Sequence, residues 1–187
     1  MLKRVIKCEH GVVTLETGIV LPIFIMLLLF FYGIIIMFLG DQAITHALSQ
    51  AAQSLSLDSY ASSMVDYSKI ENAEDLAQAL YSNLFDSDEY FSSNAKWHEE
   101  GGDVLLETVE NRFLGYLSGG RSAPKSYADD LLEYVGVVGG LDGFDFSETN
   151  VTDNVLTITV KYQQAFLFDF HGLANIDKEY VISVKMW

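Results

Sequence analysis

Glu16 is the most unusual ionisable residue in the sequence, because it lies just before a long run without charged side chains. The run extends from Gly18 to Gly40 and contains 23 residues. A carboxylate in an apolar helix costs about 2.5 to 3.5 kcal/mol at the centre of a bilayer, so Glu16 requires a favourable environment. Two environments are open to it. It can lie at the lipid headgroup level without a partner, or close to a helix N-terminus, whose macrodipole favours a carboxylate by about 0.3 to 1 kcal/mol.

The other reactive side chains form no recognisable catalytic or metal-binding motif. The sequence has neither a G-x-S-x-G nor an HExxH motif, and its four histidines are scattered. Cys8 is the single cysteine, and a lipoprotein signal would place the apolar run before the cysteine instead of after it. Acidic groups at residues 86–89 and 142–148 are expected to be solvated loops, with calcium as the alternative for the second. We therefore predict that the protein is not an enzyme and requires no cofactor.

The uncharged run is long enough to cross a membrane. At about 1.5 Å per residue it spans about 34 Å, and the hydrocarbon core of a bilayer is about 30 Å thick. A cleaved secretory signal has a shorter apolar region followed by small residues, so this run is expected to remain in the mature protein as an anchor. Three basic residues precede the run within the first seven positions, and Asp41 follows it. This charge bias places the N-terminus in the cytoplasm and residues 41–187 outside it.

The boundary between the basic segment and the apolar run resembles a prepilin peptidase site. Such a site has a basic leader that ends in glycine, an apolar helix directly after it, and a glutamate at the fifth position after the glycine. Gly11, Val12 and Glu16 match this pattern. The triplet Thr-Leu-Glu that ends at Glu16, followed by Leu-Pro at residues 21–22, is similar to the start of TadE-like minor pilins of tight-adherence (Flp-type) pili. The C-terminal Trp187 and the FHGL segment also resemble the ends of such chains.

The resemblance implies how the N-terminus is processed and used. A prepilin peptidase would remove residues 1–11 and leave Val12 with a free amine. In a packed array, this amine would pair with Glu16 of a neighbouring subunit, so that assembly would stabilise both charges. Pro22 removes one backbone hydrogen bond and is expected to kink the helix near residues 18–21, a defect that membrane helices tolerate.

The segment after the apolar run is predicted to continue the same helix as an amphipathic spine. Apolar residues recur at helical spacing on one of its faces: Ile44, Leu48, Ala51, Ala52 and Leu55. Three shorter amphipathic helices follow at residues 73–85, 103–117 and 127–135, the second with Asp103 as its N-cap. Doubled glycines between them mark loops.

The C-terminal part changes to a period of two, which is typical of strands with one buried face. Residues 156–162 and 180–186 alternate in this way, and the phenylalanines at positions 166, 168 and 170 could extend the first strand. The predicted fold is therefore α+β, with a long N-terminal transmembrane and spine helix and a small extracytoplasmic head that ends in antiparallel strands. Three parts are expected: a leader at 1–11, a transmembrane helix at 12–40 and a pilin-like domain at 41–187.

The charge of the head limits its partners. Residues 41–187 contain 8 Lys and Arg against 24 Asp and Glu. Binding to nucleic acid depends on neutralising phosphates with Lys and Arg, so DNA and RNA are not expected as ligands. The expected partners are a prepilin peptidase, other pilin or pseudopilin subunits, and membrane lipid.

Three functions fit these observations. The first is a minor pilin or pseudopilin that assembles a tight-adherence pilus, located in the bacterial cytoplasmic membrane and, after assembly, in the pilus at the cell surface. The second is a pseudopilin of a type II secretion or DNA-uptake machine, which would share the peptidase site. The third is an unprocessed single-pass membrane protein whose acidic domain binds a ligand or partner, and it would retain residues 1–11.

Overall fold

The computed structural model describes residues 9–64, 90–91, 97–119, 124–166 and 175–187. The helix predicted at residues 73–85, the acidic group at 86–89 and the phenylalanines at positions 168 and 170 lie outside these ranges. In the first helix, side chains are described from residue 16 onward.

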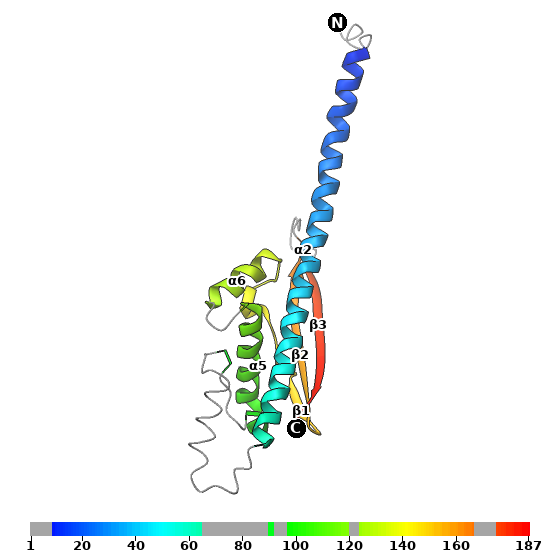
Figure 1. The fold of residues 1–187 in the computed structure, drawn as a ribbon. Helices are drawn as coiled ribbons and strands as arrows, with labels where there is room; N and C mark the ends of the chain where they lie inside the picture. The colour runs from blue at the N-terminus through cyan, green and yellow to red at the C-terminus, as the bar shows by residue number, and fades with distance from the viewer. Residues whose placement is uncertain (1–8, 65–89, 92–96, 120–123, 167–174) are drawn as a thin grey trace.

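Helix α2 (Glu9–Met64) is the longest element and contains both the apolar run and the predicted spine (Figure 1). Its continuation beyond Gly40 is confirmed, and the five apolar residues predicted on one face between Ile44 and Leu55 are all buried. α2 passes through Pro22 without being divided into two helices. The kink at this residue stays a prediction.

Among the described residues, three further α-helices lie in the head: α4 (Trp97–Glu100), α5 (Gly102–Leu117) and α6 (Lys125–Tyr134). The helices predicted at 103–117 and 127–135 are thereby confirmed. The predicted N-cap at Asp103 is wrong, because α5 begins one residue earlier and its N-cap is Gly101. Gly101 has φ 63°, a conformation that favours glycine, and Asp103 lies instead within the first turn, where the helix dipole favours its charge.

In the part of the chain that the structure describes, three antiparallel strands form one sheet in the order β1-β2-β3. The two predicted strands are β2 (Val155–Ala165) and β3 (Asn175–Lys185), and their register pairs Val155 with Lys185. β2 ends at Ala165, so its expected extension through Phe166 is wrong; the Phe166 ring lies instead against Phe30 of α2, with 5.5 Å between ring centroids.

Strand β1 (Asn150–Thr152) was not predicted. It is joined to β2 by Asp153 and Asn154, both of which have positive φ, 52° and 61°. Two consecutive left-handed residues are the signature of a type I′ hairpin turn, and Asp and Asn are among the residues that adopt it. A 3₁₀ helix, η2 (Gly140–Gly143), precedes this hairpin.

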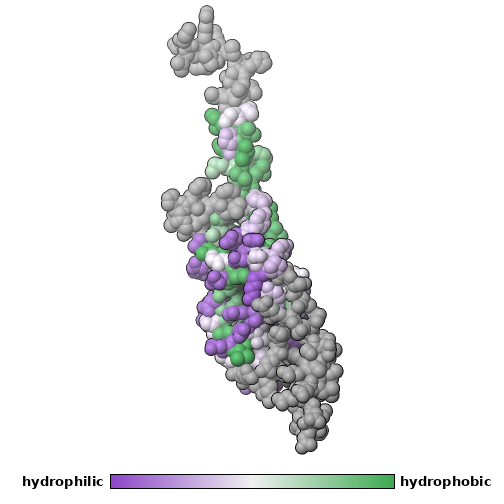
Figure 2. All heavy atoms as spheres, turned by 90° about the vertical axis from the view of Figure 1, so that its left-hand side faces the viewer, coloured by the Kyte–Doolittle hydropathy of each residue, from purple (hydrophilic) through white to green (hydrophobic). Residues whose placement is uncertain are grey.

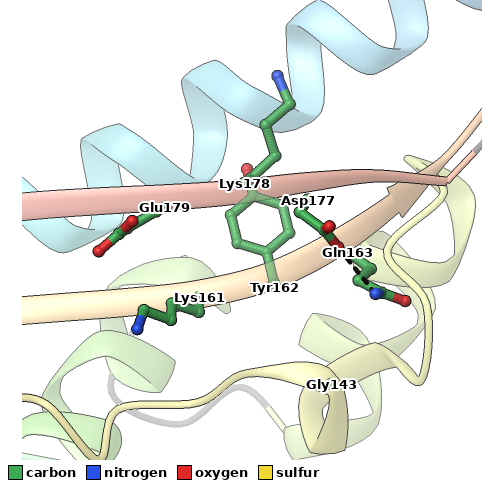
Figure 3. A pocket seen from close by; sticks show the side chains of 7 residues that line it. All are labelled: Gly143, Lys161, Tyr162, Gln163, Asp177, Lys178 and Glu179. Carbon is green, nitrogen blue, oxygen red and sulfur yellow. Dashed lines mark hydrogen bonds between the residues drawn. The ribbon is translucent and has the colours of Figure 1, made fainter.

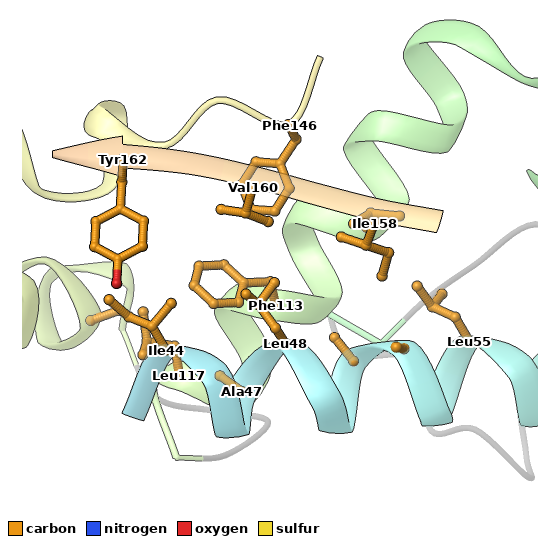
Figure 4. Packing of buried hydrophobic residues seen from close by; sticks show 14 of the residues in the cluster. Ile44, Ala47, Leu48, Leu55, Phe113, Leu117, Phe146, Ile158, Val160 and Tyr162 are labelled. Atoms are coloured by element: carbon orange, nitrogen blue, oxygen red, sulfur yellow. The ribbon is translucent and has the colours of Figure 1, made fainter. Parts of the chain in front are cut away.

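The hydrophobic core lies where the distal half of α2 packs against α5 and the sheet (Figure 4). β2 points Leu156, Ile158, Val160 and Tyr162 inward, as the alternation predicted. Phe113 of α5 contacts Phe144 and Phe146, with ring centroids 5.3 and 5.6 Å apart. The predicted α+β fold with an N-terminal spine helix is confirmed.

Candidate membrane and assembly surface

The predicted processing residues lie together at the free end of α2, away from the head (Figure 1). Gly11 and Val12 are in its first turns, and the side chain of Glu16 is exposed. Val12 and Glu16 are four positions apart, so they lie on the same helix face about 6 Å apart along the axis. Pro22 follows on the same exposed segment.

The free part of α2 is an apolar surface on all sides. Every residue from 16 to 32 is exposed, and Met26 and Ile23 expose 69% and 63% of their surface. Within the described residues, α2 holds one stretch, Glu16–Tyr60, that is long and apolar enough to cross a membrane. Figure 2 shows apolar side chains gathered on the free part of α2 and hydrophilic ones predominating on the visible face of the head. An exposed apolar surface of this size requires lipid or a protein partner to cover it.

The head covers one side of α2 before the apolar run ends. Gly33, Ile36 and Gly40 are buried, whereas Ile35 and Phe38 on the opposite side stay exposed. The buried positions follow one another at spacings of three and four, which is the seam expected for one helix face. The last third of the predicted membrane helix is therefore shared between the apolar environment and the head.

Gly40 allows the helix and the head to approach closely. A Cβ atom at this position would lie 2.8 Å from Cβ of Val135, closer than two carbon atoms can pack. Gln164 fixes the same contact, because its Nε2 donates to the carbonyl oxygens of Met37 at 3.2 Å and Val135 at 2.9 Å. The junction thus combines backbone hydrogen bonding with tight packing.

Asp41 is the first charged residue beyond the apolar run, and the sheet neutralises it. Lys178 Nζ lies 2.8 Å from Asp41 Oδ2, and the Tyr162 hydroxyl donates to Oδ1 at 3.0 Å. In Figure 3 both side chains point from the sheet toward α2. Burial, and then the charge of Asp41, raise the pKa of Tyr162 well above its usual value of 10, so this tyrosine stays protonated and serves as a donor.

A hollow lies beside this ion pair, and several of the charged and polar side chains that line it are already paired (Figure 3). Gln163 Nε2 donates to Asp177 Oδ1 at 2.8 Å, and Lys161 forms an ion pair with Glu148. Asp145, in the acidic group at 142–148, accepts a hydrogen bond from the Ser147 amide at 2.9 Å. Across the described ranges, no group of three or more His, Cys, Asp and Glu side chains is placed to hold a metal ion.

At the far end of the spine, a buried ion pair joins α2 to α5. Arg112 Nη2 lies 2.5 Å from Asp58 Oδ2, and both side chains are 1% exposed. Arg112 also donates to Ser54 Oγ at 2.5 Å and to the Phe91 carbonyl oxygen at 3.2 Å. The sequence did not predict this pair, although each charge falls three positions after a core residue: Leu55 in α2, which was predicted on the buried face, and Val109 in α5, which the structure shows to be buried.

The outer face of the spine carries no formal charge. Between Asp41 and Asp58 the sequence contains no Asp, Glu, Lys or Arg, although the head as a whole is strongly acidic. The exposed side chains of this interval include Gln42, His46 and Gln53. This face of the spine therefore differs from the rest of the acidic head in carrying only uncharged side chains.

The fold and its exposed helix define a class of protein: an α+β chain with a long N-terminal helix whose described part holds one stretch long and apolar enough to anchor it in a membrane. Residues 11–53 match the family model described as TadE-like protein. The match begins at Gly11, includes Val12, Glu16 and Pro22, and ends within the spine. Searches of curated proteins and of solved structures found no match. The predicted TadE-like resemblance is confirmed over these residues.

Proposed function

We propose that the protein is a minor pilin or pseudopilin of a tight-adherence pilus, and that a prepilin peptidase processes it after Gly11. The observation that carries this proposal is the family match, which begins at the glycine where the mature chain would follow. Residues 1–11 form the leader in this proposal, 12–40 the transmembrane helix and 41–187 the pilin-like domain outside the cytoplasm.

The exposed N-terminal half of α2 would hold the subunit in the membrane before assembly and in contact with other subunits afterwards. Cleavage turns the backbone nitrogen of Val12 into a cationic amine at the start of an apolar helix. Glu16 is exposed and lies one turn further along, so a neighbouring subunit displaced along the axis can place its own Glu16 beside this amine. Two opposite charges in an apolar array stabilise each other far more than two solvated ones.

The orientation of the subunit follows from its charges. Basic residues precede the anchor, and the first charge after it, Asp41, is held by the head. Basic flanks remain preferentially in the cytoplasm, so the head would face outward.

Peptidase cleavage tests the proposal most directly. We would coexpress the full chain with a prepilin peptidase and measure the intact mass of the purified product. The expected result is loss of residues 1–11, with cleavage blocked in Gly11→Val. Gly18→Val is the matched control, because it makes the same change at a second glycine of α2. A Cβ atom at Gly18 would meet no other atom within 4 Å.

Two outcomes would contradict the proposal. Persistence of the full-length chain while a control prepilin is cut would favour the unprocessed single-pass protein with an acidic binding domain. The cleaved chain could instead crosslink to subunits of a secretion or DNA-uptake machine and not to those of a tight-adherence pilus. That result would favour a pseudopilin of a type II secretion or DNA-uptake machine.

A further inference from the structure

The stretch of α2 between Glu16, the last charge before the apolar run, and Tyr32 is shorter than a bilayer is thick. From Glu16 to Tyr32, beyond which the head begins to bury one side of the helix, the axis advances about 24 Å, whereas the hydrocarbon core measures about 30 Å. If Glu16 lies at the inner headgroup level, the outer boundary of the hydrocarbon falls beyond Tyr32. The membrane-proximal end of the head is then at the height of the outer lipid surface.

Helix α6 is the element of the head that lies at this height. In Figure 1 it crosses the end of the head that is nearest the free part of α2. The Tyr134 hydroxyl lies 3.0 Å from that of Tyr32. The following residue, Val135, packs against Gly40, and its carbonyl oxygen accepts from Gln164. These contacts fix the C-terminal end of α6 beside residues 32–40 of α2.

The outward face of α6 has the composition of an interfacial surface. Tyr127 and Tyr134 are seven positions apart, lie on the same face, and are 58% and 59% exposed, whereas Ala128 and Leu132 on the other face are buried. Tyrosine is enriched at membrane interfaces, because its ring is apolar and its hydroxyl can bond with water or headgroups. Asp130 and Glu133 are also exposed, and their charges would keep the helix at the headgroup level, above the hydrocarbon.

The ion pair at Asp41 sets the outer limit. Asp41 lies about 37 Å from Glu16 along the axis, beyond the hydrocarbon but within the roughly 40 to 45 Å that include the headgroups. Its pairing with Lys178 allows the charge to remain so close to the lipid. α6 is attached to α2 between the end of the hydrocarbon and this pair.

We propose that α6 is a membrane-interface element, which rests on the outer lipid headgroups through Tyr127 and Tyr134 and seats the head against the bilayer. The proposal depends on the membrane anchoring of α2 that the proposed function includes. Lipid covers this face, because the height of the face is fixed by the apolar helix to which α6 is bonded.

Tryptophan fluorescence in brominated lipid tests the depth of α6. The chain has two tryptophans, of which Trp97 is fully buried and Trp187 is at the C-terminus, and these give the baseline. The full chain carrying Tyr127→Trp would be reconstituted into phosphatidylcholine vesicles without bromine and into vesicles brominated at two depths, near the glycerol end and near the methyl end of the acyl chains. The expected result is a blue-shifted emission from the new tryptophan and its loss in the vesicles brominated near the glycerol end.

Two matched variants make every outcome decisive. Phe24→Trp places the reporter in the middle of the free helix, and Leu57→Trp places it on an exposed position of α2 about 37 Å beyond Tyr32. Quenching at positions 24 and 127 but not at 57 supports the proposal.

Quenching at position 24 alone would contradict the contact between α6 and the lipid headgroups, and would leave the membrane anchoring of α2 supported. Quenching at none of the three positions overturns the anchor as well. Equal quenching at 127 and 57 shows a head that lies along the membrane, which also contradicts the proposal.

Discussion

The buried ion pair between α2 and α5 should make single and double substitutions behave in opposite ways. Arg112 and Asp58 are each 1% exposed, and Arg112 also bonds Ser54 Oγ and the Phe91 carbonyl oxygen. Asp58→Leu leaves the guanidinium buried without its counter-charge, which costs about 3 to 5 kcal/mol of the free energy of unfolding. Arg112→Met strands the Asp58 carboxylate at a similar cost. The double variant removes both charges and should lie close to wild type.

Urea unfolding of the full chain in detergent micelles, followed by Trp97 fluorescence, would measure this difference. With an m-value of about 1 to 3 kcal/mol per molar urea, each single variant should lower the midpoint by about 1 M or more. Lys161→Met is the control, because it breaks an exposed ion pair with Glu148 and should change the midpoint little. The reasoning would be refuted if the losses of unfolding free energy in the two single variants simply added in the double variant. Arg112 and Asp58 would then stabilise the contact between α2 and α5 independently, and not as an ion pair.

Four further predictions follow from the site. Glu16→Gln should leave membrane insertion and leader removal intact but reduce crosslinking to partner pilins and pilus yield at matched protein levels; wild-type values for both would leave Glu16 as a headgroup-level residue. A reporter fused after Trp187 should be active only outside the cytoplasm, and cytoplasmic activity would reverse the proposed topology. Gly40→Val should lower the thermal stability of the head by overpacking against Val135, whereas Gly18→Val should not; equal melting temperatures would refute the close approach. The pKa of Tyr162 is higher in the folded protein than in the unfolded chain, so the free energy of unfolding should be constant below pH 10 and fall as the pH rises further. Tyr162→Phe should make this fall smaller in unfolding measurements at alkaline pH, and an unchanged fall would contradict the prediction.

The sequence predicted the long elements well because their periodicity is dictated by one buried face. The helical spacing from Ile44 to Leu55 and the alternation from Leu156 to Tyr162 both match the buried residues of the structure. β1 escaped prediction because three residues are too few to show a period; the Asp-Asn pair before β2 was the available signal, since both residues tolerate positive φ.

The tertiary contacts of the site could not be predicted in this way. Asp41, Tyr162 and Lys178 are brought together by the packing of α2 on the sheet, over separations of more than a hundred residues, and local pattern carries no information on such pairing. The packing of the head against the last part of the apolar run could not be predicted for the same reason. The sequence defines where the uncharged residues end at Gly40, but only the fold shows that the head already contacts α2 at Phe30 and Tyr32.

The unbroken course of α2 makes the subunit a lever. Anchor and spine belong to one helix, so a change in the inclination of the anchor is carried to the head without a hinge to absorb it. From Tyr32 to Met64 the axis extends about 48 Å, and an inclination of about 20°, common for membrane helices, displaces the distal end sideways by about 16 Å. Membrane thickness, which contributes to that inclination together with packing against neighbouring helices, would thereby influence where the far end of the head stands.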